Sequence, residues 1–357
     1  MNDNFKIWNE RCNFAQKSLA VLFQDEKDGS MIQGVPPENP SNNNFCYWWH
    51  AHAIDVLIDG YLRTGDRSYT ERAEKVLKNV LAKNGGGITN LYYDDMEWMA
   101  LALLRTWECT RKDEYRDLVF TLWEDIKKGW NGNMGGGIAW RKTQLDYKNT
   151  PANAPASILA SRLYRRFKRE DDMLWAKRVY CWNRENLTDP ETGFVWDGMN
   201  RNGDGKIDKD WVFTYCQGVV IGAALELYRN TGEEKYRNDA ESTWKASVSV
   251  IARPAGGILP DEGGGDCGLF KGIYIRYIRE LYETVPGHGD IAALISSNAE
   301  SLWRHMDRAS GLISRGWARE AESSVDLSTQ LSGVMLFEAM ASLQRSAENC
   351  GGSKKSG

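Results

Sequence analysis

Two consecutive aspartates, Asp94 and Asp95, are the residues whose type and spacing most clearly suit chemistry. They stand in the stretch LYYDDMEWMALALLR (residues 91–105), after two tyrosines and before a segment that is apolar almost without a break. An aspartate at a helix start is ordinary, because its carboxylate accepts hydrogen bonds from free backbone amides and suits the positive end of the helix dipole. One aspartate suffices for capping. The second therefore raises the alternative of a working pair of acids.

Two carboxyl groups held close together push their pKa values apart, because the second negative charge must form beside the first. One group stays ionised, helped by the helix dipole, while the other holds a proton near neutral pH. Hydrolysis of a glycosidic bond uses this division of labour. Consecutive side chains diverge by about 100° inside a helix. At a helix start the first residue has a non-helical backbone, so both carboxyl groups can point into one cleft.

The elements that position this pair follow from a repeat. A glycine-rich turn, followed by β-branched or aromatic residues, recurs six times at intervals of roughly 50 to 60 residues. Each interval is long enough for two helices and their loops. The copies lie at 28–34, 85–88, 135–140, 192–198, 255–265 and 310–317.

The segments between the turns alternate in character. Those before each turn are amphipathic and charged, at 5–24, 66–83, 113–129, 170–187, 233–250 and 290–308. Those after each turn are apolar nearly all round, at 47–63, 95–108, 152–167, 212–230, 268–284 and 326–345. A half-solvated outer ring around a buried inner ring is predicted. The expected fold is an all-α (α/α)6 barrel with almost no strand, forming one domain over 1–349 with a disordered tail at 350–357.

In such a barrel, the turns from outer to inner helices lie at one end, where the positive ends of the inner-helix dipoles converge. Aromatic rings there could stack on sugar faces, and polar groups could bind hydroxyls, although ordinary core packing explains single examples equally well. Trp140 is expected on a flexible glycine stretch. The candidate substrate-binding residues are Trp48, His52, Tyr93, Trp98, Trp140, Lys148, Asn149, Tyr215, Gln217, Phe270 and Lys271.

Bulk properties exclude several partners. The 357 residues carry a net charge of −4 with mixed signs, which argues against nucleic acid and against a membrane surface. No run is long enough to span a membrane, and a monomer is expected. The first twenty residues lack an apolar signal region, so a cytoplasmic location is expected unless a signal was removed, in which case the protein is secreted or periplasmic. The seven cysteines form no CxxC pair, so neither disulfides nor zinc are expected.

The stretch NRNGDGKID (200–208) is similar to the start of an EF-hand loop. Asn200, Asn202 and Asp204 stand where such a loop has oxygen ligands. Trp211 stands where the bidentate glutamate belongs, and the first position is Asn rather than Asp. No cofactor is expected, and these three residues form only a weak calcium candidate against a polar surface turn.

Four stretches together resemble glycoside hydrolase family 76: YYDDMEWMALALLR, YWWHAHAIDVL, WNGNMGGGIAWRK and FTYCQGVVIGAALELYR. The likeness runs from the first helix to the last. It implies an (α/α)6 barrel, like that of the bacterial endo-α-1,6-mannanases and related fungal cell-wall transglycosidases, and a retaining mechanism. By this resemblance Asp94 is the nucleophile and Asp95 the acid/base, acting on α-mannan or manno-oligosaccharides. Cys216 departs from the family, which commonly has Asn at that position.

Three alternatives share parts of this pattern. A sugar epimerase or isomerase on the same barrel needs histidine bases in the cleft, and the chain has four histidines. A non-catalytic carbohydrate-binding protein needs the aromatics but not the paired acids. A mannan transglycosylase needs every residue named, and differs only in the acceptor that resolves the intermediate. Endo action is the favoured expectation, and exo action stays open.

Overall fold

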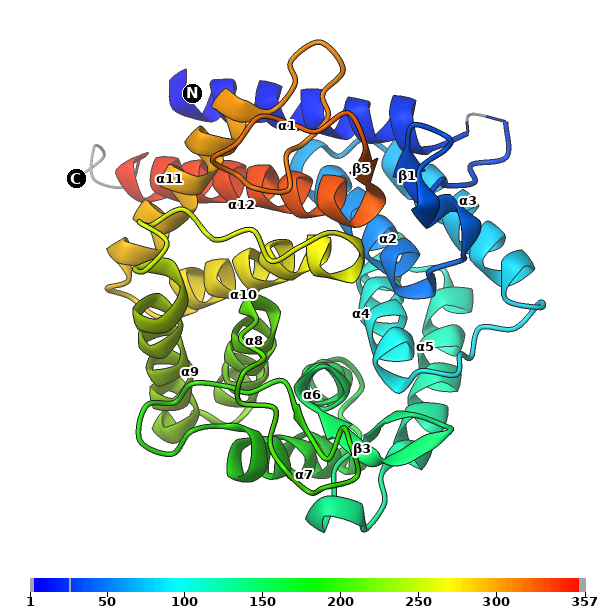
Figure 1. Ribbon diagram of the computed structural model, residues 1–357, viewed down its shortest axis with the longest axis vertical. Coiled ribbons are helices and arrows are strands. Elements are labelled where there is room, and N and C mark those ends of the chain that lie inside the picture. Colours follow the sequence, from blue (N-terminus) through cyan, green and yellow to red (C-terminus); the bar gives the residue numbers. More distant parts are fainter. Residues whose placement is uncertain (1–2, 26, 353–357) are drawn as a thin grey trace.

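The computed structural model describes residues 3–25 and 27–352, and over these residues it is an (α/α)6 barrel (Figure 1). The outer helices are α1 (Asp3–Phe23), α3 (Ser68–Lys83), α5 (Asp113–Ile126), α7 (Glu170–Leu187), α9 (Glu234–Ser247) and α11 (Gly289–His305). The inner helices are α2 (Tyr47–Thr64), α4 (Tyr93–Thr110), α6 (Ala154–Phe167), α8 (Thr214–Thr231), α10 (Phe270–Thr284) and α12 (Leu327–Gly352). The predicted fold is confirmed. The expectation of a disordered tail is wrong for residues 350–352, which belong to α12, and residues 353–357 lie outside the described residues.

Burial explains why the two sets of helices read differently in the sequence. On the outer helix α3, one face alone is buried, made by Ala73, Val76, Leu77 and Val80. The inner helix α8 is buried at every position from Thr214 to Leu227. Glycines let the inner helices approach closely, because a Cβ at Gly218 would lie 2.7 Å from the Tyr274 Cα of α10. Similarly, a Cβ at Gly272 would lie 2.7 Å from the Ser332 Cα of α12.

Short strands occupy some of the predicted turns. β1 (Gly34–Val35) pairs with β5 (Val325–Asp326), which ties the first and last hairpins together. β2 (Ala139–Arg141), β3 (Gln144–Asn149) and β4 (Gly198–Met199) form an antiparallel sheet in the order β2-β3-β4. The expectation of a flexible stretch at Trp140 is wrong, because this residue lies within β2. Pairing with β3 fixes the direction of its backbone.

Two expectations from composition can be compared with the structure. No helix in the described part of the chain is long and apolar enough to cross a membrane. The cysteines whose side chains are described are free, which agrees with the absence of CxxC pairs; they are Cys12, Cys46, Cys109, Cys181, Cys216 and Cys267.

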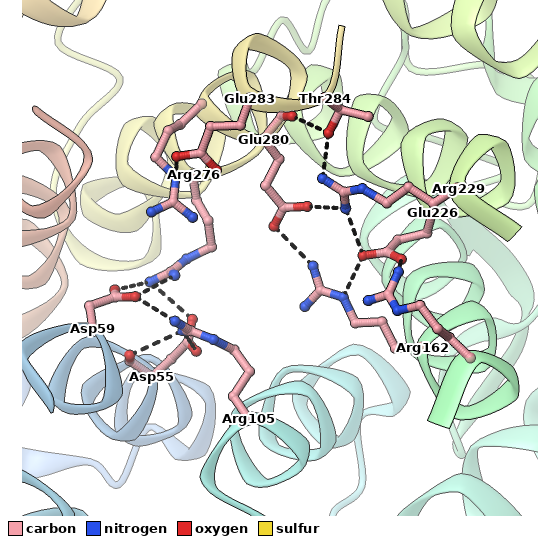
Figure 2. Close-up of polar contacts among 12 residues, drawn as sticks. Asp55, Asp59, Arg105, Arg162, Glu226, Arg229, Arg276, Glu280, Glu283 and Thr284 are labelled. Atoms are coloured by element: carbon pink, nitrogen blue, oxygen red, sulfur yellow. Dashed lines mark hydrogen bonds and ion pairs between the residues drawn. The ribbon is translucent and has the colours of Figure 1, made fainter. Parts of the chain in front are cut away.

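The end of the barrel where the inner helices finish is held by a network of ion pairs around a cavity of about 280 Å³ (Figure 2). On one side, Arg105 and Arg276 contact both Asp55 and Asp59. Guanidinium groups suit this end, because helix C-termini carry partial negative charge.

On the other side of the same cavity, Glu226 is the centre of the network. Its side chain is 1% exposed and accepts hydrogen bonds from Arg162 at 2.8 Å, from Arg229 at 3.0 Å and from Arg165. Glu280 pairs with Arg162 and Arg229 at 2.9 Å each, which closes the cluster. Each of these charges is therefore compensated where water is scarce.

Glu226→Ala should lower the free energy of unfolding by about 3–5 kcal/mol, because it leaves buried guanidinium groups without their carboxylate. Glu300→Ala is the control: Glu300 is half-exposed and pairs with Arg11 at 3.0 Å, so its loss should cost about 1 kcal/mol or less. Urea unfolding of both variants measures the difference. We call this end of the barrel, where the inner helices finish, the rear, and its cavity the rear cavity. Equal and small losses would show that the ion pairs around the rear cavity do not stabilise the barrel.

Candidate active site

A cleft of about 620 Å³ opens at the end of the barrel where the inner helices begin. The first turns of α2, α4, α8 and α10 line it, together with the loops that precede them and the segment 147–151 before α6. This placement is the one expected from the repeat. Of the thirteen candidate catalytic and substrate-binding residues, eight line this cleft: Asp94, Asp95, Trp48, Trp98, Trp140, Asn149, Tyr215 and Phe270.

Asp94 and Asp95 both lie in the first turn of α4, which begins at Tyr93. Asp94 therefore has a helical backbone, and the expectation of a non-helical start at this residue is wrong. The residue before the helix is Tyr92, whose extended backbone carries no capping side chain. The Asp95 amide donates a hydrogen bond to the Asp94 carboxylate at 3.0 Å. Asp94 thus satisfies one free amide of the helix start. Asp95 makes no ion pair among the described residues, so capping accounts for only one of the two acids.

Burial raises the pKa of both carboxyl groups. For Asp94 the pKa rises to about 7; hydrogen bonds from the Asp95 amide and the Trp140 side chain oppose the rise, and the charges of Asp266 and Asp197 add to it. For Asp95 the pKa lies well above its ordinary value, because burial is reinforced by the neighbouring charges of Asp94 and Asp266. Asp94 is therefore the group that ionises more readily, and Asp95 the one that holds its proton.

Two further carboxylates in the cleft were missed by the sequence analysis. Asp197 is buried and accepts hydrogen bonds from the Tyr215 hydroxyl at 3.0 Å, the Tyr147 hydroxyl at 3.1 Å and Arg201 at 2.7 Å. It lies in the glycine-rich turn TGFVWDG (192–198), which the sequence analysis used only to define the repeat. Its position at the cleft end of the barrel was the available signal.

Asp266 is the second missed carboxylate. It lies in the short helix η6 (Gly265–Leu269) before α10, directly after the glycine-rich turn at 255–265. The indole nitrogens of Trp48 and Trp49 each donate to one of its oxygens at 2.9 Å. The side chain also lines the cleft, so it faces the same space as the aspartate pair.

Aromatic rings wall the cleft. Tyr215 and Phe270 stack face to face, with ring centroids 3.8 Å apart and planes within 1°. Trp140 packs against Tyr92 at 5.1 Å. Trp48 and Trp98 lie 6.3 Å apart on the floor. Flat apolar faces beside carboxylates can hold a sugar by its C–H faces while the acids reach its hydroxyls.

Five of the candidate residues do not line the cleft, and each has a structural partner instead. Tyr93 packs its ring over Gly129. The Lys148 ammonium donates to the Gly137 carbonyl at 2.7 Å. The Gln217 amide pairs with both backbone groups of Val195 at 3.0 and 2.7 Å. The Lys271 ammonium donates to the Arg315 carbonyl at 2.6 Å. The fifth residue, His52, lies beneath Trp48 and Trp98 and lines the rear cavity.

The calcium candidate has the contacts of a polar turn. The Asn200 side-chain oxygen accepts from the Gly205 amide at 2.8 Å, and Asp204 accepts from the Lys206 amide at 3.1 Å. In the part of the chain that the structure describes, no group of three or more His, Cys, Asp or Glu side chains could hold a metal ion.

The barrel and its acidic, aromatic-walled cleft define a carbohydrate-processing class of protein. The family model for glycosyl hydrolase family 76 matches residues 8–349. This match covers nearly the whole chain, so the chain belongs to glycosyl hydrolase family 76.

Two solved structures illustrate the similarity. An α-1,6-mannanase from a Salegentibacter species is 41% identical; the match covers 94% of this chain and 99% of that one, with a TM-score of 0.88. A protein from Listeria innocua is 39% identical, with 95% and 98% coverage and a TM-score of 0.90. The Salegentibacter enzyme was also solved as an inactive variant lacking two consecutive aspartates, in complex with an α-1,6-linked mannotetraose.

Among curated proteins, the mannan endo-1,6-α-mannosidase of Candida albicans is 34% identical over 249 residues, which is 64% of this chain and 53% of the relative. The corresponding enzyme of Candida glabrata is 24% identical over 263 residues, which is 67% of this chain and 59% of that protein. The matched region thus spans little more than half the length of these curated relatives.

The raised pKa of Asp95 predicts a stability effect with a definite sign. An acid whose pKa is higher in the folded chain binds more protons when folded, so the free energy of unfolding falls as pH rises above about 4. Asp95→Asn removes this loss. The variant should therefore gain stability over wild type between pH 5 and 8, by at most about 1.4 kcal/mol per unit of pKa shift. Urea unfolding at several pH values tests this, and a pH-independent difference would contradict it.

Proposed function

We propose that this protein is a retaining glycoside hydrolase that cleaves α-1,6-mannosidic bonds within mannan. The observation that carries the proposal is the aspartate pair: two adjacent carboxyl groups share one aromatic-walled cleft, with the pKa of Asp95 raised further from its ordinary range than that of Asp94. The mannan substrate and the endo mode are inferred from the family and from the names of its similar members.

In the first step, Asp94 attacks the anomeric carbon as a carboxylate, and Asp95 gives its proton to the departing glycosidic oxygen. Hydrogen bonds from the Asp95 amide and the Trp140 side chain favour the ionised form of Asp94. The positive end of the α4 dipole acts in the same direction. In the second step, Asp95 takes a proton from water, which attacks the glycosyl–Asp94 ester and releases the sugar with retained configuration.

Asp266 is suited to bind a sugar hydroxyl group in the cleft, because the indoles of Trp48 and Trp49 both donate to its Oδ1 and leave Oδ2 available. Asp197 lines the same cleft but already accepts from four protein donors, so a sugar hydroxyl would share its lone pairs with Tyr215, Cys216, Tyr147 and Arg201. Burial raises the pKa of Asp197, and the nearby charge of Arg201 opposes the rise. An ionised carboxylate is a strong acceptor for a hydroxyl donor.

The histidine positions argue against an epimerase. No histidine is among the described residues that line the cleft. His50 and His52 are buried, and burial lowers the pKa of these side chains to about 4 and about 3. His288 and His305 lie at either end of the outer helix α11. A histidine base acting on a sugar carbon has no candidate in the cleft.

Asp94→Ala and Asp95→Ala should each reduce kcat/KM on α-1,6-mannan by several orders of magnitude while leaving the fold intact. On a mannoside with a good leaving group, Asp95→Ala should recover much of the first step, because that leaving group needs no proton. Asp94→Ala should not recover. Steady-state kinetics and circular dichroism measure both effects. Equal recovery would show that the roles are exchanged, and full activity in either variant would remove that residue from the mechanism.

The pH dependence of kcat/KM should be bell-shaped, with limbs that belong to the coupled pair. Activity should fall below about pH 7, as Asp94 takes up a proton and cannot attack. It should fall again at higher pH, as Asp95 loses the proton that the leaving group requires. The alkaline limb should vanish with a substrate that needs no protonation. If that limb persists unchanged, another group is the general acid.

Product analysis on linear α-1,6-mannan distinguishes the modes of action. An endo hydrolase gives a ladder of oligosaccharides, and proton NMR of the first products should show the α-anomer. Longer products than the starting oligosaccharide would identify a transglycosylase. Binding without any product would leave a carbohydrate-binding protein, and mannose as sole product would identify an exo enzyme.

A further inference from the structure

Trp211 differs from the other tryptophans that line the cleft. It is 44% exposed, whereas Trp48 and Trp98 on the floor are 8% and 5% exposed. It lies on the loop between β4 and α8, which includes the calcium-like stretch. An exposed aromatic ring that lines a cleft offers a flat apolar face to a ligand.

Three contacts within the protein hold Trp211 in place. The Arg201 guanidinium lies 3.7 Å from the centroid of the Trp211 ring. Phe213 meets the same ring edge-on at 5.8 Å. The Trp211 amide also donates to the Asp208 carbonyl at 3.2 Å. Arg201 covers one face of the ring, and the exposed part forms a fixed platform. Because the side chain is already ordered, binding a ligand costs less conformational entropy.

Contacts across the turn hold the loop that carries Trp211 in one conformation. Asn200, Gly203 and Gly205 all have positive φ angles, of 67°, 73° and 71°. The Asn200 side chain bonds across the turn to the Gly205 amide, and Met199 bridges to Ile207. The stretch NRNGDGKID thereby has a structural use as the mount of an exposed indole at the cleft.

Arg201 also reaches the interior of the cleft. Besides stacking on Trp211, it pairs with Asp197 at 2.7 Å and with Asp208 at 3.0 Å, and donates to the Tyr147 hydroxyl. It is the one basic residue among those that the structure places in the cleft lining. The same guanidinium therefore supports the outer indole and the inner carboxylate.

We propose that Trp211 is a stacking platform for a mannosyl unit bound away from the scissile bond, and that it makes cleavage depend on chain length. This inference rests on the proposed function of the cleft. A pyranose would lay its C–H face on the free face of the indole. Arg201 is a positioning residue: it fixes Trp211 for distal binding and Asp197 for binding next to the bond.

Trp211→Ala should raise KM for α-1,6-mannohexaose and for long mannan by about tenfold or more, because it removes an aromatic surface that the bound sugar would cover. Its kcat should stay near the wild-type value, and kinetics on a short activated mannoside should not change. Val212→Ala is the matched control, because Val212 is a similarly exposed neighbour outside the cleft lining. Arg201→Lys should instead lower kcat on substrates of every length, since it disturbs Asp197 as well.

A second measurement determines the contribution of Trp211 to ligand affinity without turnover. α-1,6-Mannotetraose is titrated into Asp95→Asn and into Asp95→Asn/Trp211→Ala, with calorimetric detection. The double variant should bind at least about tenfold more weakly. Binding that depends on Trp211 in a protein whose wild type cleaves no mannan would sustain the platform and overturn the hydrolase proposal. If wild type cleaves mannan but Trp211→Ala matches Val212→Ala in both assays, or loses activity equally on short and long substrates, the platform is wrong.

Discussion

The structure depends on one electrostatic constraint: two adjacent carboxyl groups must lie at the edge of an apolar core without a cation beside them. Asp94 and Asp95 have no ion-pair partner in the described part of the chain, and the one arginine of the cleft is engaged by Asp197. Protonation of one group and the positive end of the α4 dipole reduce the repulsion between their charges. A lysine beside the pair would lower both pKa values and remove the acid from the mechanism.

The barrel sorts charge by the direction of its inner helices. Where they begin, the cleft holds carboxylates, which the positive ends of the helix dipoles favour. Where they end, guanidinium groups surround the rear cavity, and each is paired with a carboxylate such as Glu226 or Asp59. The rear charges are paired, whereas Asp94 and Asp95 at the front have no ion-pair partner among the described residues, and burial raises the pKa of both. Carboxyl groups are thus paired with guanidinium groups at the rear, while the aspartate pair at the front has no such partner in the described part of the chain.

The sequence predicts the helices well because burial imposes a period on every hairpin, and the six-fold repeat then fixes the end at which Asp94 must lie. It predicts single contacts less well. Lys148 and Gln217 are polar residues near inner-helix starts, yet each turns to a backbone carbonyl, since a buried polar group must find a partner wherever one is near. The sequence did not single out Asp197 and Asp266, because they lie in or beside turns, where aspartate is common for local reasons. The β2–β3 hairpin that carries Trp140 is closed by Lys142 and Thr143, which lack the Gly or Asn that marks a tight hairpin turn in a sequence.

The central claim is that the aspartate pair retains one proton at neutral pH, and carboxyl ¹³C NMR of protein labelled at aspartate tests it most directly. Titration from pH 3 to 10, with Asp94→Asn and Asp95→Asn to assign the signals, follows each group separately. One aspartate resonance should titrate well above the ordinary range of an aspartate in wild type, vanish in Asp95→Asn and move to lower pH in Asp94→Asn. Titration of both carboxyl groups below pH 5 would contradict the account.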